Sequence, residues 1–423
     1  MKKILFLFLF LYLYTNAQEV VQLRGKVVDE ENGAPLVFAN IVYPAKSLGF
    51  TTNSTGEFSF ALKASAKDNI VVSHIGYGKA TYAIKDFLIL ANGIIKLKRT
   101  SVSLDEVVIV GKKESADALM KKLYKAYKKY RLNEPHIAEA YYVEKAKYND
   151  KFVFYRASIG YSLYKTHQFN SSAYSDYDFF CENTKMSDIH PIWVKKMEEM
   201  DTVQNSNAVS SGDNINQFNR FEYYGPLSKK HNQYDYKIDS SYIQNGVHFY
   251  KVVFEGEKIR GTVSFNSNNF YITDVEYETI DLFSMPFRKR LEGKVSIQFI
   301  YYDDVPFVSK IRTDYTYQKF SHQNTLVILS QKIKDFSLSF DEYWAFETYS
   351  SLPFIEYIPE KWNLLHIDTE VNNEYKLIQN DLFINNKSLE QQFRDNSGKW
   401  INPKFERNGK PAFLKIQELK NNF

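Results

Sequence analysis

The stretch RGTVSFNSNNFYITDVEY, residues 260–277, decides how the larger part of this chain is interpreted. Apolar and polar side chains alternate on both sides of a short polar segment at Ser267 and Asn268. Alternation with a period of two places one set of side chains on a buried face and the other set in water. The stretch therefore predicts an antiparallel hairpin with one buried face.

The same pattern recurs before and after this hairpin. Turn signals such as Asn149-Asp150, Asn245-Gly246 and Asp303-Asp304 separate many of the neighbouring apolar runs. Short polar turns between alternating runs predict an antiparallel meander. The expected strands are residues 138–147, 152–164, 234–243, 248–255, 259–265, 270–277, 294–302, 306–318 and 325–335.

One helix is expected in front of this meander, over residues 115–130. Apolar side chains recur there at steps of three and four, and lysines lie mostly on the other side. A basic amphipathic helix is able to rest on a membrane, but a helix that covers a sheet is the commoner arrangement. We therefore expect a curved antiparallel sheet, a half-barrel, with one covering helix.

The first hundred residues predict a different β-structure. Gly33 and Gly56 stand in turn segments where the backbone needs freedom from a side chain. About seven short strands within ninety residues indicate a sandwich, because one sheet of that size must bury its apolar face against another. The expected strands are residues 22–28, 36–43, 57–62, 70–73, 79–84, 94–97 and 106–110.

Five blocks in this region occur in a recognisable order. They are LRGKVVD at 23–29, GAPL at 33–36, ANI at 39–41, TTNSTGEF at 51–58 and SHIGY at 73–77. In this order they resemble the carboxypeptidase-like regulatory domain, which stands at the front of many exported proteins of Gram-negative envelopes. The resemblance implies a prealbumin-like β-sandwich of the carbohydrate-binding-like class, usually without catalysis.

Two shorter segments resemble other envelope proteins. SLDEVVIVG at 103–111 is similar to the link that precedes the plug in TonB-dependent receptors. A receptor barrel would need several hundred further residues of amphipathic strands, so a complete transporter is not expected. The hairpin at 260–277 resembles lipoprotein-carrier-like half-barrels, in which the hollow side of the sheet holds an acyl chain or a partner peptide.

These patterns predict a mainly β protein with five segments. A signal peptide at 1–17 precedes a regulatory-like sandwich at 20–100 and a linker at 101–113. The helix and half-barrel sheet occupy 114–340. An irregular C-terminal extension with one short helix, near residues 389–394, occupies 341–423.

The first 17 residues predict export. Lys2 and Lys3 precede an apolar run of about 11 residues, which is shorter than the about 20 that span a membrane as a helix. Ala17 then suits cleavage, and Gln18 stands where a lipoprotein would need cysteine. We expect a periplasmic, outer-membrane-associated or secreted protein without an acyl anchor.

Charge and cysteine content exclude several classes. The formal charge of +4 falls to +2 once the two lysines of the signal peptide are removed, which gives no electrostatic case for nucleic acid. Cys181 is the single cysteine, so no intramolecular disulfide is expected. Cys181 is interpreted as a packed side chain, because no histidine-containing motif surrounds it.

One pair of residues has the spacing of zinc ligands. His136-Ile-Ala-Glu139 matches His-x-x-Glu, but a zinc peptidase also needs a third ligand and a general base. No nucleophile elbow, phosphate loop or calcium loop occurs in the sequence. We therefore expect no catalytic, metal or cofactor-binding residues, and no cofactor.

The leading hypothesis is a non-catalytic exported protein that binds or scaffolds a glycan, a lipid or an envelope protein, with peripheral association with the outer membrane as one form. The first alternative is an accessory component of a TonB-dependent uptake system. The second is a divergent zinc-dependent carboxypeptidase-like hydrolase that uses His136 and Glu139.

Overall fold

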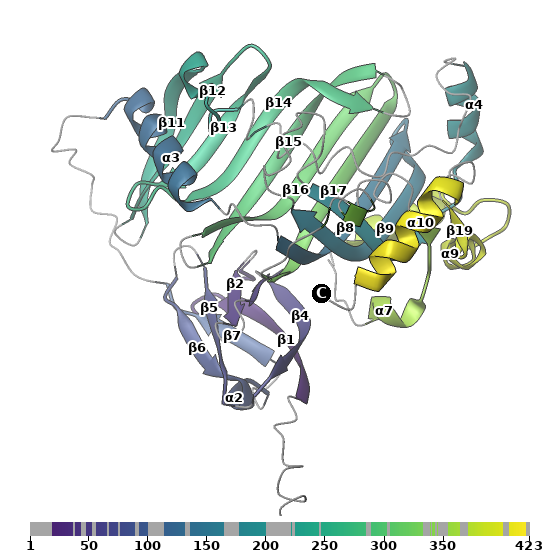
Figure 1. Ribbon diagram of the computed structural model, residues 1–423, viewed down its shortest axis with the longest axis horizontal. Helices are drawn as coiled ribbons and strands as arrows, with labels where there is room; N and C mark the ends of the chain where they lie inside the picture. The colour runs from purple at the N-terminus through teal and green to yellow at the C-terminus, as the bar shows by residue number, and fades with distance from the viewer. Residues whose placement is uncertain are drawn as a thin grey trace, which may run out of the picture.

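The computed structural model of the chain combines a small two-sheet unit with one large curved sheet (Figure 1). The residues that the structure describes are 19–36, 39–43, 48–52, 56–65, 67–74, 77–88, 93–99, 114–131, 136–164, 177–199, 221, 225–244, 247–284, 289–302, 305–332, 339, 341–342, 345, 354–363, 371–400 and 406–419. The expected signal peptide and the linker segment 103–111 lie outside these residues. No helix among the described residues is long and apolar enough to cross a membrane.

The N-terminal unit is the expected sandwich. One sheet contains β4 (Glu57–Ala64), β1 (Glu19–Asp29) and β7 (Ile94–Leu97), in that order. The other contains β3 (Leu48–Thr51), β2 (Asn40–Tyr43), β5 (Asn69–Ser73) and β6 (Ala80–Ala83), and α2 (Ile84–Leu88) follows it. The alternating patterns had not revealed β3, and the expected strand at 106–110 lies outside the described residues.

The core of the sandwich is apolar. Leu23, Val27, Ile41, Ile70 and Ile95 are fully buried between the two sheets. Burial of such side chains stabilises a fold by roughly 1.5–3 kcal/mol each. The sandwich is therefore held by the packing of one sheet against the other.

The turn after β1 is fixed by the carboxylate of Asp29. This carboxylate accepts hydrogen bonds from the backbone N–H of Glu31 (2.8 Å), the hydroxyl of Tyr77 (2.8 Å) and Nε of Arg99 (2.6 Å). Burial raises the pKa of Asp29, but these hydrogen bonds outweigh it and hold the pKa below its ordinary value. Gly33 closes the turn with a φ of +70°.

The large sheet has ten antiparallel strands and is not closed into a barrel (Figure 1). Its order is β10-β9-β8-β17-β16-β15-β14-β13-β12-β11. The strands are β8 (His136–Tyr148), β9 (Lys151–Tyr164), β10 (Tyr177–Met186), β11 (Asp235–Gln244), β12 (Val247–Glu255), β13 (Ile259–Asn266), β14 (Ile272–Ser284), β15 (Lys289–Tyr302), β16 (Val305–Tyr317) and β17 (Phe320–Lys332). The sequence predicts all of them except β10.

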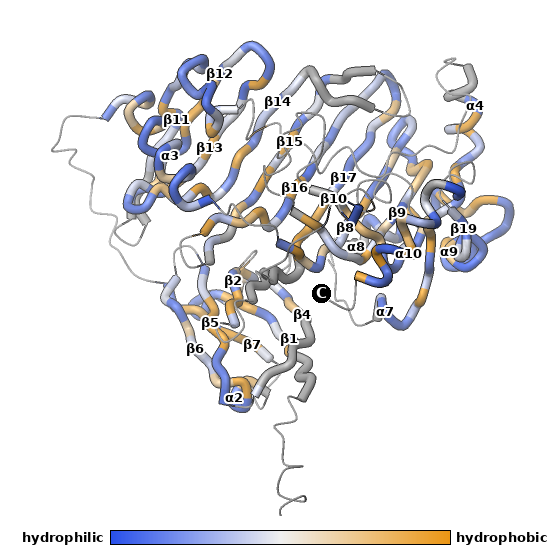
Figure 2. The backbone as a smooth tube through the Cα atoms, in the orientation of Figure 1, coloured by the Kyte–Doolittle hydropathy of each residue, from blue (hydrophilic) through white to orange (hydrophobic). Residues whose placement is uncertain are grey.

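Turn chemistry sets the register of these strands. Asn149 and Asp150 have φ values of +47° and +65°, as a two-residue hairpin turn requires. They join β8 to β9 in the expected way, with Tyr148 opposite Lys151. Hydrophobic and hydrophilic residues alternate along the strands (Figure 2). The sheet therefore has one apolar face over β11–β17 and one polar face.

Helix α3 (Ala116–Tyr130) packs on the apolar face, as expected. Ser115 caps it, and the Ser115 hydroxyl accepts a hydrogen bond from the backbone N–H of Ala118 at 3.2 Å. Leu119, Met120 and Leu123 are buried against the sheet at spacings of one, three and four residues. The helix closes the core that the strands leave open.

The opposite face of β8–β10 is covered by the C-terminal segment, which contains more helix than expected. Its helices are α7 (Pro359–Asn363), α8 (Val371–Asp381), α9 (Leu389–Asn396) and α10 (Glu406–Leu419), with the short strands β18 (Phe354–Ile355) and β19 (Lys399–Trp400). Apolar side chains of α8 to α10 pack on β8, β9 and β10. Only α9 was expected, so the extension is a second covering layer.

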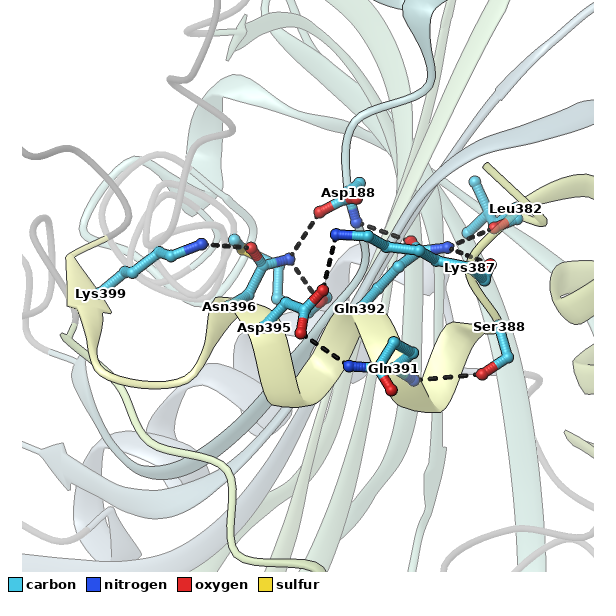
Figure 3. Close-up of polar contacts among 10 residues, drawn as sticks. Asp188, Leu382, Lys387, Ser388, Gln391, Gln392, Asp395, Asn396 and Lys399 are labelled. Atoms are coloured by element: carbon cyan, nitrogen blue, oxygen red, sulfur yellow. Dashed lines mark hydrogen bonds and ion pairs between the residues drawn. The ribbon is translucent and has the colours of Figure 1, made fainter. Parts of the chain in front are cut away.

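Polar contacts fasten α9 to the end of β10 (Figure 3). The buried side chain of Gln392 accepts a hydrogen bond from the backbone N–H of Asp188 at 2.9 Å and donates to the carbonyl of Leu382 at 2.6 Å. Asn396 Nδ2 donates to the carbonyl of Met186 at 3.2 Å. Since buried amides must find partners, these bonds fix the place of α9 on the sheet.

Candidate functional site

The candidate zinc pair does not converge. His136 and Glu139 lie three positions apart in β8, so their side chains point to opposite faces of the sheet. His136 is buried, with its ring edge-on to Phe307 at 5.4 Å between centroids, whereas Glu139 is exposed. Among the described residues, no group of three histidine, cysteine, aspartate or glutamate side chains is placed to hold a metal ion. A shared zinc ion is incompatible with this geometry.

Cys181 lies in β10 and is buried in the core of the sheet. Burial raises the pKa of its thiol, which keeps the sulfur protonated at neutral pH. A protonated thiol with little access to solvent is a poor nucleophile. The geometry therefore favours the interpretation of Cys181 as a packed side chain.

A buried polar network crosses the middle of the sheet. Glu144 of β8 lies opposite Arg156 of β9, and Arg156 Nη2 is 2.6 Å from Glu144 Oε2. His322 of β17 lies 2.8 Å from the other carboxylate oxygen, through its Nε2. All three side chains are at most 1% exposed. Charges this deep stabilise a fold only when they are paired.

The network continues through Asn324 of β17. Its amide nitrogen lies 3.2 Å from His322 Nδ1, and its oxygen accepts a hydrogen bond from the Tyr142 hydroxyl at 2.7 Å. This pattern is satisfied by an imidazole with its proton on Nε2, donated to Glu144. The network links three adjacent strands but has no access to solvent, so it orders the sheet rather than contacting a substrate.

The sequence contained one signal for this network. Glu144 lies on the same face of β8 as Ala138, Ala140 and Tyr142, and these three residues face the core. A glutamate on an apolar face of a strand requires a buried partner. That partner could not be named, because His322 is 178 residues away in the chain.

The polar face of β12–β16 carries an open groove of about 640 Å³. Arg260 Nη2 lies 2.9 Å from Glu278 Oε2, and Lys294 Nζ lies 3.5 Å from Glu278 Oε1. The hydrogen bond from Arg260 is the main reason why the pKa of Glu278 lies below its ordinary value. In β16, which lies next to β15, Arg312 Nε is 2.7 Å from Asp314 Oδ2 of the same strand.

A second hollow of about 690 Å³ continues this groove toward the β12–β13 turn. Charged and polar side chains that point away from the core line much of both hollows, together with parts of apolar residues such as Phe254 and Val295. We call this surface the charged groove. Its main lining side chains are Glu255, Arg260, Thr262, Glu276, Glu278, Lys294, Ser296, Arg312 and Asp314. Sequence patterns predicted that these residues face water but not that they enclose a hollow.

Comparison with known proteins identifies the N-terminal unit. Residues 23–109 match the family model of the CarboxypepD_reg-like domain. The resemblance found in the sequence is confirmed, and the chain carries such a domain at its front. No curated protein matches the chain.

The large sheet is distantly similar to solved structures. A DUF1329 family protein from Desulfovibrio piger is 11% identical, with a TM-score of 0.28, over 55% of this chain and 98% of that one. A LolA superfamily protein from Nitrosomonas europaea is 9% identical, with a TM-score of 0.23, over 53% and 96%. A putative outer membrane lipoprotein-sorting protein domain from Vibrio parahaemolyticus is 10% identical, with a TM-score of 0.25, over 53% and 94%.

Proposed function

We propose that this protein is a non-catalytic binding or scaffold protein of the cell envelope, in the periplasm or at the outer membrane. Its CarboxypepD_reg-like domain and its signal-peptide-like first residues support this assignment. The proposed ligand is an envelope protein, a glycan or a lipid. The position of His136 and Glu139 on opposite faces argues against the alternative of a zinc hydrolase.

The observation that carries the proposal is the charged groove on a sheet whose other face is filled. Val263, Val275 and Ile297 are fully buried on the apolar face under the helix layer. That face is occupied by the protein's own side chains where the structure describes it. The groove side chains lie in solvent, with Lys294 76% exposed, and they offer charges of both signs to a ligand.

Charge reversal in the groove tests this proposal. Immobilised wild-type protein is incubated with envelope extract, and retained protein, glycan and lipid are identified by mass spectrometry. We expect Lys294→Glu to lose most of the specifically retained ligand, because it removes a positive charge and places a second carboxylate opposite Glu278. Lys237→Glu in β11 is the matched control, since Lys237 is exposed and lies outside the groove.

Two results would count against the proposal. Equal retention by Lys294→Glu and Lys237→Glu would remove the groove as the binding surface. A wild-type protein that retains no lipid, glycan or protein in native mass spectrometry would remove the binding function itself.

A further inference from the structure

Aromatic side chains form a row at the end of the sheet far from the charged groove. His248, Tyr250 and Phe265 follow one another across β12 and β13, with ring centroids 4.3 Å and 5.9 Å apart. Phe270 continues the row at 5.9 Å from Phe265, with an angle of 24° between the rings. Phe265 is fully buried, and the other rings are partly exposed.

Two tyrosines extend this row, Tyr271 directly before β14 and Tyr301 in β15. The rings of Tyr271 and Tyr301 are stacked at 3.9 Å between centroids and 2° between planes. The hydroxyl of Tyr301 accepts a hydrogen bond from the backbone N–H of Ile272 at 2.7 Å, which fixes the ring of Tyr301. We call these six residues the aromatic rim: His248, Tyr250, Phe265, Phe270, Tyr271 and Tyr301.

The backbone at this turn is held in an unusual conformation. Phe270 has a φ of +59°, a region that bulky residues rarely adopt. The turn is nevertheless well fastened, because Asn266 Oδ1 accepts from the backbone N–H of Asn269 and Asn269 Oδ1 accepts from that of Tyr271. Strain of this kind tends to persist where it positions groups for function.

The chemistry of the aromatic rim indicates which class of ligand it binds. None of its six side chains is charged at neutral pH, since burial lowers the pKa of His248. An acyl chain would need a channel, but the core behind the rim is filled by Val263, Val275 and Ile297. Tyr301 supports Tyr271 from the core side, and the partly exposed ring of Tyr271 suits the C–H face of a sugar ring. The exposed amides of Asn268 and Asn269 suit the hydroxyl groups of the sugar.

From the stacked tyrosines and the exposed asparagine amides beside them, we propose that the aromatic rim is a binding site for a neutral glycan. This inference rests on the proposed binding function and names a ligand class for it. The site differs from the charged groove in face, in position along the strands and in chemistry. The protein therefore presents two binding surfaces on one sheet.

Calorimetric titration of the full chain with cellohexaose, maltohexaose and chitohexaose tests the site. We expect at least one of these oligosaccharides to bind, and Tyr271→Ala to weaken its affinity about tenfold through loss of the stacking face. Tyr271→Phe retains the ring and should retain most of the affinity. Tyr317→Ala is the matched control, because Tyr317 is a partly exposed tyrosine at the opposite end of the strands.

Folding is checked for each variant by thermal denaturation, and Asn268→Ala provides a second probe that removes no packed ring. It should weaken binding about threefold through loss of an amide partner. The inference is overturned if no oligosaccharide binds at millimolar concentration, or if Tyr271→Ala and Asn268→Ala bind like wild type. If groove-dependent retention of an envelope ligand persists in that case, the proposed function stands and only the glycan site is lost.

Discussion

The N-terminal sandwich and the ten-stranded sheet bury their apolar faces in different ways. The sandwich packs two small sheets on each other, and its core cluster consists of apolar side chains. Among the described residues, helices cover part of each face of the large sheet, and an ionic network lies within it. Both units are held by apolar packing, but the large sheet also contains a fully buried ion pair, whereas the Asp29–Arg99 pair of the sandwich lies at a turn with Arg99 half exposed.

Removal of one partner from the buried ion pair should have the largest effect. Glu144→Leu leaves the charge of Arg156 buried without its partner, so we expect a loss of about 3–5 kcal/mol in the free energy of unfolding. Urea unfolding followed by tryptophan fluorescence measures this loss, since all four tryptophans lie beyond residue 190. The sandwich should keep its hydrogen-exchange protection.

The double variant Glu144→Leu with Arg156→Met sharpens this test. Replacement of both charges by apolar side chains removes the uncompensated charge, and we expect a large part of the lost stability to return. Equal stability of the single and double variants would show that the ion pair does not order the sheet.

In the sandwich, we expect the largest loss of stability from a substitution in a turn. Gly56 has a φ of +75°, and a Cβ there would lie 2.7 Å from the carbonyl oxygen of Val27. We expect Gly56→Ala to cost about 2 kcal/mol, seen as faster hydrogen exchange in β1 and β4. Gly33→Ala is the control: its φ is +70°, but nothing lies within 4 Å of the added atom, so the cost should be about 1 kcal/mol.

A smaller effect is expected at the start of α3. Ser115→Ala removes the side chain that caps the first turn and should cost about 1 kcal/mol. Hydrogen exchange should accelerate in α3 and not in the sandwich. Ser388→Ala, which removes the corresponding cap of α9, should leave exchange in α3 unchanged.

The smallest effect concerns acid sensitivity of the sandwich. The folded-state pKa of Asp29 lies below its ordinary value, so its contribution to stability is present above that ordinary value and is lost as the pH falls through the folded pKa. We expect Asp29→Asn to reduce the fall in sandwich melting temperature between neutral pH and about pH 3. An unchanged pH profile would mean that the contacts of Asp29 with Tyr77 and Arg99 contribute nothing to folding.

Local sequence patterns predicted most of the strands, because the alternation of side chains and the turn residues that define a strand are close together in the chain. Helix α3 has a cap and a clear apolar period, and the β8–β9 hairpin has two residues suited to positive φ. Strand β10 escaped prediction because its second half, from Glu182 to Lys185, is polar and a bulge follows Cys181. The polar side chains there pair with the C-terminal segment, which no local pattern shows.

The site was less predictable than the fold. In the ion-pair network, Glu144 and His322 are 178 residues apart in the chain, so their meeting depends on the order of strands in the sheet. Trp362 Nε1 donates to Asn183 at 2.6 Å across 179 residues in the same manner. Helix α10 contains Pro411, a residue that is unfavourable in the interior of a helix, so no local pattern signals this helix.

The pairing of β8 with β17 joins the first strand of the sheet to the last one made. Residues 137–148 lie beside residues 320–332 in the middle of the sheet. As the polypeptide grows from its N-terminus, the β8–β9 hairpin ends at residue 164, and the edge of β8 stays unpaired until β17 begins at residue 320. This pairing closes a long loop, so assembly of the sheet should be slow.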